Sequence, residues 1–340
     1  MVAFRPGPGP RNLITDVPGL KVGQAEDSAA RTGVTVILPD ERAVAACDVR
    51  GGAPGTRETE ALSPENLVDA VDAVVLSGGS VYGLGAADGV VAWLGARGRG
   101  YGLVEGIPKS PVVPAAILFD MANGGDKGWG EDPPHRELGK RAVATAGLNF
   151  ALGTAGSGYG AMAGGLKGGT GSASAVTADG YTVGAVVAVN SGGSVIAPGG
   201  RTVWAAPFEL ADEFGGLGPV GLRAGPDEWG SAKRPADARN TTIACVAVDA
   251  VLTPAQAKRV AVMAQDGFAR AIRPVHAPFD GDVVFAISTG RRPLAQPDNF
   301  TVARLGALAA DTLARAIARG VFEAKPWPDA YVPCWRDLRG

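Results

Sequence analysis

The junction near residue 240 constrains this chain more than any other stretch of the sequence. Residues 225–237 are rich in glycine, proline and charge, which indicates a loop, and 242–251 form an apolar run that predicts a strand. Asn240 and Thr241 stand at the seam between them. A threonine hydroxyl there has the chemistry to attack the preceding carbonyl and leave Thr241 as a new N-terminus, with its amine as base. Threonine at a strand start is also typical of β propensity, so the junction alone leaves both interpretations open.

Length and charge narrow the class of protein. The chain has 340 residues, of which 46% are hydrophobic and 19% charged, so it is long enough to bury a large core. A net charge of -2 gives no electrostatic indication of a nucleic-acid partner or an anionic membrane. The sequence contains neither the apolar region of a signal peptide nor a run long enough to span a membrane. We therefore expect a cytoplasmic protein.

The cysteines and histidines do not indicate a metal site. Cys47, Cys245 and Cys334 are odd in number and far apart, which argues against both a disulfide framework and zinc. His276 lies near Asp280, where it could act as ligand or base. Without a second histidine or cysteine nearby, we interpret it as a structural or loop histidine, and we expect no metal or organic cofactor.

Hydrophobic patterns and turn residues divide the chain into strands and helices. Strands are expected at 33–39 and 43–49, joined as a hairpin, and then at 73–77, 112–120, 172–176, 181–189, 242–251 and 283–288. Helices are expected at 64–68, 81–97, 137–146, 253–272 and 302–320, with a long irregular loop at 199–238. Because the strands are grouped and the helices are long and few, layered α+β packing is favoured over an alternating parallel sheet.

Two glycine-rich stretches superficially suggest a phosphate loop. Gly156-Ser157-Gly158 and Lys167-Gly168-Gly169-Thr170 lack both the Walker order and a clean Gly-x-Gly-x-x-Gly, so tight turns are the better interpretation. The sequence also lacks a Gly-x-Ser-x-Gly elbow, which disfavours an α/β-hydrolase triad.

Four polar residues near strand ends are candidates for chemistry. Asp280 and Asp282 precede a strand at spacing i, i+2, and in an extended segment both carboxylates point to one face and could reach one nucleophile. A turn with carboxylates facing water is the alternative. Lys167 lies among glycines and Asn190 ends an apolar strand. A solvated loop lysine and a turn asparagine are their plainer interpretations.

Taken together, these stretches resemble the DmpA-type peptidase family. That family comprises L-aminopeptidase/D-esterases, β-peptidyl aminopeptidases and the nylon-oligomer (6-aminohexanoate oligomer) endohydrolases. The similarity runs from about residue 13 to the last helix, and the combined order of motifs is specific although each motif alone is weak. The segments that carry it are 48–56, 76–84, 166–169, 189–191, 240–243 and 279–282.

The resemblance implies a four-layer α-β-β-α sandwich of the N-terminal-nucleophile type. It implies one catalytic domain, 1–340, made as a precursor that cuts itself between Asn240 and Thr241. The larger chain, 1–240, and the smaller chain, 241–340, are expected to stay associated. These heterodimers are expected to assemble further into a homo-oligomer, a tetramer.

The resemblance also implies roles for the candidate residues. Thr241 matches the family nucleophile, and Asp280 and Asp282 match the carboxylates that hold it in the nylon-oligomer branch. Lys167 and Asn190 match that branch's lysine and asparagine beside the nucleophile. The lysine would offset the two carboxylates, and the asparagine would donate to the oxyanion.

One position departs from the pattern. Phe119 stands where some members have a tyrosine, so Tyr159 or Tyr82 would have to contribute if a tyrosine hydroxyl is needed. We expect Phe119 and Tyr159 to contact substrate.

The motif pattern predicts the reaction. In the aminopeptidase branch the cut precedes a serine and follows a glycine, whereas this chain has Asn-Thr at the cut and Asp-Gly-Asp downstream. We therefore expect an amide hydrolase for linear oligomers such as 6-aminohexanoate oligomers, acting through an acyl-enzyme on Thr241. The alternatives are an aminopeptidase/D-esterase acting on small peptides and amides, an acyltransferase of the ornithine acetyltransferase type, and a non-enzymatic assembly protein with the same sandwich.

Overall fold

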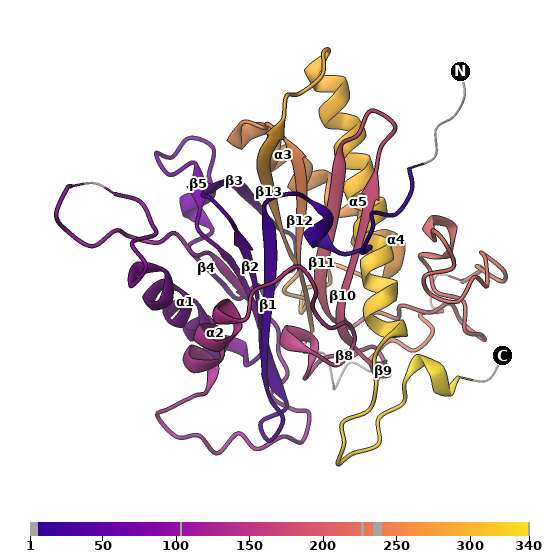
Figure 1. The fold of residues 1–340 in the computed structure, drawn as a ribbon. Coiled ribbons are helices and arrows are strands. Elements are labelled where there is room, and N and C mark those ends of the chain that lie inside the picture. The colour runs from indigo at the N-terminus through magenta and orange to yellow at the C-terminus, as the bar shows by residue number, and fades with distance from the viewer. Residues whose placement is uncertain (1–5, 103, 226–227, 234–239, 339–340) are drawn as a thin grey trace.

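Two stacked β-sheets form the centre of the molecule, and helices cover the outer face of each sheet (Figure 1). The computed structural model describes residues 6–102, 104–225, 228–233 and 240–338. The expected four-layer α-β-β-α sandwich is therefore confirmed.

The first sheet has five strands in the order β1-β2-β6-β7-β4, antiparallel except for the parallel pair β6–β7. Its strands are β1 (Leu20–Asp27), β2 (Thr32–Pro39), β6 (Val74–Ser77), β7 (Ala115–Ile117) and β4 (Thr56–Arg57). The outer helices α1 (Ala86–Gly95) and α2 (His135–Ala144) cover this sheet.

The second sheet has six strands in the order β10-β11-β12-β13-β3-β5, antiparallel except for the parallel pair β12–β13. Its strands are β10 (Gly169–Val176), β11 (Thr182–Asn190), β12 (Thr241–Ala250), β13 (Val283–Arg292), β3 (Ala43–Val49) and β5 (Ala70–Val71). The helices α3 (Pro254–Ala264), α4 (Asp266–Ala271) and α5 (Asp298–Phe322) cover it. A short ribbon of β8 (Met162–Ala163) and β9 (Leu166–Lys167) lies below.

The central strand β12 shows why the apolar run after Thr241 is so long. Ile243 and Cys245 point into the core between the two sheets, whereas Ala244 and Val246 point into the core under the helices. Both faces of the strand are buried, so the sequence has no alternation of polar and apolar residues.

Two expected elements are wrong. The strands β2 and β3 do not form a hairpin, because they belong to different sheets and the chain crosses the sandwich between them. Residues 64–68 form no helix; a single 3-10 turn, Glu60–Leu62, precedes them. Ser63 and Pro64 supply a start signal, but the segment has no face to bury, and Leu67 is 78% exposed.

The helix expected at 253–272 is divided at Gln265 into α3 and α4, and the other helices begin and end close to their expected positions. The helix expected at 81–97 begins as a 3-10 turn, Ser80–Gly85, before α1. The longest helix is α5, with 25 residues. In the described part of the chain, no helix combines the length and apolarity needed to cross a membrane.

Candidate active site

The sheet register brings the candidate residues to one edge of the six-stranded sheet. Asn190, the last residue of β11, pairs with Thr241, the first residue of β12, because these strands are antiparallel. The strand β13 runs parallel to β12, so the segment just before β13 lies at the same edge, and Asn240 bridges to Asp280 there. Residues far apart in the sequence thus surround the Asn240–Thr241 peptide bond.

The carbonyl oxygen of Asn240 receives two hydrogen bonds. The Thr241 hydroxyl donates to it at 2.5 Å, and the Gly281 N–H donates to it at 3.1 Å. A Cβ atom on Gly281 would lie 2.6 Å from Thr241 Oγ1, so no larger residue fits without moving the threonine. Thr241 itself is only 4% exposed. The hydroxyl and a main-chain donor therefore converge on one peptide group.

Asp282 is held by three donors. Its Oδ1 accepts from the Thr242 N–H at 2.9 Å. Its Oδ2 accepts from the His276 N–H at 3.1 Å and lies 2.9 Å from His276 Nδ1. His276 is thus more than a loop histidine, because its ring orients a carboxylate next to the nucleophile candidate.

Asp280 is less completely bound. Its Oδ2 accepts from the Ala277 N–H at 2.8 Å, whereas Oδ1 is buried without a hydrogen-bond partner among the described residues. Burial first, and then the Asp282 charge, raise the pKa of Asp280 to about 6. Neither carboxylate exceeds 3% exposure, so the alternative of a water-facing turn is wrong.

The nearby cations differ from those expected. His276 and Lys233 lower the pKa of Asp280, although by less than burial raises it. Lys167 was expected to offset both carboxylates, but burial has the largest effect on the pKa of Lys167, which it lowers, and the groups whose charge raises that pKa are Cys334 and then Asp120.

Asn190 joins the nucleophile strand to two neighbouring segments. Its Oδ1 accepts from the Met162 N–H at 3.0 Å, and its Nδ2 donates to the Phe119 carbonyl at 3.0 Å. An amide NH₂ carries two hydrogens, so one donor remains for another acceptor. Phe119 is half-buried and contacts this site through its main chain.

Lys167 is completely buried, so the solvated loop lysine is wrong. Its ammonium donates to the carbonyls of Ala161 at 2.9 Å, Gly168 at 2.8 Å and Gly158 at 3.3 Å. Burial lowers the pKa of Lys167 to about 7. Lys167 pairs with Met162 across β8–β9, and the Met162 N–H donates to Asn190 Oδ1, so Met162 connects Lys167 to Asn190 in space.

The two candidate tyrosines lie elsewhere. Tyr159 is buried in a small cluster with Trp327 and Val332, on the side of Lys167. Tyr82 is 46% exposed and packs edge-on against Trp129. Within the described ranges, neither hydroxyl forms a hydrogen bond with Thr241.

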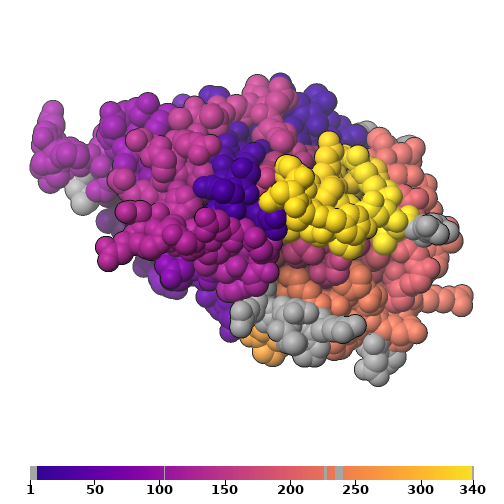
Figure 2. Space-filling model, turned by 90° about the horizontal axis from the view of Figure 1, so that it is seen from below, coloured from indigo at the N-terminus to yellow at the C-terminus, as the bar shows by residue number. Residues whose placement is uncertain are grey.

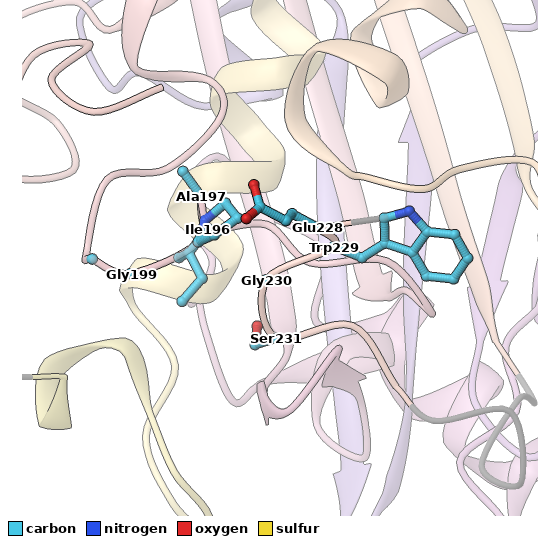
Figure 3. A pocket seen from close by; sticks show the side chains of 9 residues that line it. Ile196, Ala197, Gly199, Glu228, Trp229, Gly230 and Ser231 are labelled. Atoms are coloured by element: carbon cyan, nitrogen blue, oxygen red, sulfur yellow. The ribbon is translucent and has the colours of Figure 1, made fainter. Parts of the chain in front are cut away.

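A hollow of about 380 Å³ is lined by residues 196–200 and 228–231 (Figure 3). Glu228 extends toward Ala197 there, whereas the Trp229 ring points away. The same stretch reaches the site, because the Ser231 carbonyl accepts from the Gly165 N–H at 2.5 Å and the Lys233 N–H donates to the Gly192 carbonyl at 2.8 Å. Residues 231–233 therefore lie against the end of β11 and the turn between β8 and β9.

The glycine-rich stretches have structural roles. Gly156–Gly158 forms a 3-10 turn, and Gly169–Val176 is strand β10. No group of three or more histidine, cysteine or acidic side chains in the described ranges could hold a metal ion.

Two groups at the site were not predicted from the sequence. The Gly281 N–H is a main-chain donor, and a sequence carries no signal for one beyond the small residue itself. Trp327 lies beside Lys167 but comes from the C-terminal segment, where no motif singles it out.

Known proteins are similar to this chain in sequence and in fold. The profile of peptidase family S58 matches residues 12–330. An uncharacterized aminopeptidase of Mycobacterium bovis is 45% identical, over 96% of this chain and 98% of its own length. A 6-aminohexanoate-oligomer endohydrolase of Kocuria sp. is 28% identical, over 91% of this chain and 86% of its own length.

Solved structures of aminopeptidases have a similar fold. A β-aminopeptidase of Burkholderia sp. has a TM-score of 0.68 and 26% identity, covering 94% of this chain and 90% of its own. The L-aminopeptidase D-Ala-esterase/amidase of Ochrobactrum anthropi, a variant of the Ntn-hydrolase fold, has a TM-score of 0.70 and 23% identity. It covers 98% of this chain and 92% of its own.

The sandwich therefore has the Ntn-hydrolase fold. Since the family profile spans most of the chain, the chain belongs to peptidase family S58, the DmpA family, and is a hydrolase of the peptidase and amidase type.

Proposed function

We propose that this protein is a self-cleaving amide hydrolase with Thr241 as its N-terminal nucleophile. The observation that carries the proposal is the Asn240 carbonyl, which receives the Thr241 hydroxyl at 2.5 Å and the Gly281 N–H at 3.1 Å. Attack on this carbonyl places negative charge on its oxygen, where the Gly281 N–H already points. One such donor contributes roughly 3–4 kcal/mol to the stability of a transition state.

Self-cleavage would then proceed in two steps, an acyl shift from nitrogen to oxygen and hydrolysis of the resulting ester. Thr241 Oγ bonds to the Asn240 carbonyl carbon, the C–N bond breaks, and the hydroxyl proton ends on the Thr241 nitrogen, which leaves an ester. Water hydrolyses that ester, so Asn240 gains a carboxylate and Thr241 regains its hydroxyl beside a free α-amine. An α-amine has an ordinary pKa of about 7.7–8.0, which suits a base at neutral pH.

The surrounding residues fit roles in substrate turnover. Asp280 and Asp282 would hold the new ammonium and hydroxyl, and Lys167, with its pKa near 7, would be partly neutral and able to accept a proton. The second amide hydrogen of Asn190 would donate to the acyl oxygen. Phe119 and Tyr159 would contact the substrate and take no part in proton transfer.

The two products of cleavage would stay together because one sheet contains both. The strands β12 and β13 belong to 241–340, and they are hydrogen-bonded to β11 and β3 of 1–240. Separation would break two full strand pairings and open the core. Further assembly into a homo-oligomer of these heterodimers is part of the same proposal.

For the substrate we propose linear, weakly charged amide oligomers such as 6-aminohexanoate oligomers, with cleavage of internal bonds. The support is the threonine nucleophile with Asp-Gly-Asp downstream, together with the similarity to a 6-aminohexanoate-oligomer endohydrolase. An aminopeptidase is the second candidate, because the relatives at 45% identity carry that description.

Product sizing separates the two candidates. The purified protein is given a linear 6-aminohexanoate oligomer and, separately, an amino-acid p-nitroanilide, with Thr241→Ala as the matched inactive control. Release of mid-length oligomers supports cleavage of internal bonds. Exclusive removal of the N-terminal residue from the anilide or a peptide would establish the aminopeptidase instead, and equal activity of the control would refute both.

A further inference from the structure

We infer that Trp327 is a positioning residue for Lys167 and that its indole forms the cover that keeps water from the ammonium. The inference rests on the proposed function for its catalytic consequence, but not for the contact itself. It concerns the C-terminal segment after α5, which reaches back to a lysine that would belong to the other chain after cleavage.

The first observation is the contact with the ammonium. The centroid of the Trp327 ring lies 5.1 Å from Lys167 Nζ, and the Arg31 guanidinium carbon also lies over the ring, 4.8 Å from its centroid. Trp327 is 5% exposed, and Lys167 is fully buried. The indole is thus the apolar surface that faces an ammonium whose hydrogens are donated to carbonyls.

The second observation is that Trp327 fixes the loop that binds the ammonium. Its Nε1–H donates to the Tyr159 carbonyl at 2.8 Å. Tyr159 stands between Gly158 and Ala161, whose carbonyls accept from Lys167. One side chain therefore both covers the ammonium and holds its acceptors.

The third observation is that the rest of the segment is anchored. The Pro333 carbonyl accepts from the Lys167 N–H at 2.7 Å, and Asp329 pairs with Arg31 at 2.9 Å. Figure 2 shows the C-terminal part of the chain, in yellow, packed against the N-terminal part, in indigo, on this face of the molecule. The tryptophan is held from both sides, so it is a fixed cover rather than a mobile one.

Two effects of the indole on the lysine oppose each other. Exclusion of water disfavours the charged amine by up to about 3–5 pKa units for a fully buried group. A cation–π contact favours the charged amine, by about 1.5 units for a desolvated contact. Exclusion of water is the larger effect, so removal of the indole is expected to raise the pKa of Lys167 toward its ordinary value. The other groups that act on this ammonium are Asp120 and Cys334.

The first experiment measures the cover without using activity. Acetic anhydride acylates neutral, accessible amines, and mass spectrometry of the peptide that contains Lys167 gives the rate. The reaction is run near the ordinary lysine pKa of about 10.4, where about half or more of the amine is neutral in every variant, so that the rate reports access rather than protonation. In the Thr241→Ala protein, adding Trp327→Ala is expected to speed acylation of Lys167 at least tenfold. Trp327→Phe, which keeps the aromatic face, is expected to stay within threefold. Tyr331→Ala, at a 77% exposed position of the same segment, is the matched control and should leave the rate unchanged. An unchanged rate in Trp327→Ala overturns the inference.

The second experiment reads the catalytic consequence. In the otherwise native protein, Trp327→Ala should move the acidic limb of the pH–rate profile for amide hydrolysis upward by about 1 unit or more, and Trp327→Phe should restore most of it. A uniform loss of rate with the limb in place and with acylation of Lys167 unchanged would mean a merely structural tryptophan and would overturn the inference. Faster acylation without any change in the pH profile would uphold the cover and instead remove Lys167 from the proposed mechanism.

Discussion

The two sides of Thr241 are built differently. On the acidic side, Asp280 Oδ1, both polar side-chain atoms of Asn240 and Thr242 Oγ1 are buried without hydrogen-bond partners in the described ranges. On the lysine side, the ammonium of Lys167 has three carbonyl acceptors and an aromatic cover. Both sides are buried, so exposure to solvent does not explain the difference.

Under the proposed self-cleavage, the difference indicates which contacts are already made in the uncut chain. A buried polar atom without a partner costs free energy of about 1–3 kcal/mol, and such atoms gather where another state of the site supplies the partner. The new ammonium of Thr241 would supply donors to the acidic side. The Lys167 ammonium already has three acceptors, so its own contacts are made in the uncut chain.

The largest expected effect comes from Thr241, the proposed nucleophile. Thr241→Ala removes the hydroxyl and the γ-methyl but leaves the main chain in place, so it should abolish cleavage and lower amide hydrolysis by about 10³-fold or more. Thr241→Ser keeps a hydroxyl and should still cleave, although more slowly. A denaturing gel and an amide-hydrolysis assay check both, and cleavage in the alanine variant would end the proposal.

The next effect compares the stabilities of the two sides, in uncut Thr241→Ala protein. Lys167→Met fills the space but removes a donor from three carbonyls, of which those of Gly158 and Ala161 keep a main-chain donor, so the free energy of unfolding should fall by about 1–3 kcal/mol. Asp280→Asn keeps the shape and removes an uncompensated charge, so stability should change by less than about 0.5 kcal/mol or rise. Urea denaturation measures both. Equal losses of unfolding free energy in the two variants would show that the lysine and the carboxylate do not differ in their contribution to stability.

A third effect separates the two sides by pH, again in the Thr241→Ala protein. The pKa of Asp280 is raised to about 6, so the native state binds its proton more tightly than the unfolded state. This contribution makes stability fall as pH rises from about 4 to about 6. The pKa of Lys167 is lowered to about 7, so the unfolded state binds more protons and stability rises with pH from about 7 to about 10.

Each slope should disappear with its own residue. Asp280→Asn should flatten the acidic window and leave the alkaline one, and Lys167→Met should do the reverse. Urea midpoints across the two windows give the slopes. A slope that survives removal of its residue would assign the titration to another group.

The smallest effect tests the ring that orients Asp282. His276→Gln should slow self-cleavage about 3- to 10-fold, because Asp282 keeps the main-chain N–H donors of His276 and Thr242 and loses only the ring contact. The half-time of cleavage measures this. A block as complete as that of Thr241→Ala would instead place the histidine among the reacting groups.

The residues at the sheet edge around Thr241 were easier to predict from the sequence than the strand neighbours and the distant contacts that surround them. The apolar run after Thr241, the end of β11 at Asn190 and the i, i+2 carboxylates all carry local signals, so they could be assigned before the register was known. The assignment of β2 and β3 to separate sheets could not, because strands that are apolar throughout do not reveal their neighbours. The Gly281 donor and the Trp327 cover depend on contacts between distant segments, for which local sequence has no signal.

The central claim is that the chain cuts itself between Asn240 and Thr241. Freshly purified wild-type protein is separated on a denaturing gel, and the smaller band is sequenced from its N-terminus. The account predicts two bands, the smaller beginning Thr-Thr-Ile-Ala at Thr241, and a single full-length band for Thr241→Ala. A wild-type protein that hydrolyses amides while its chain stays whole would contradict the account.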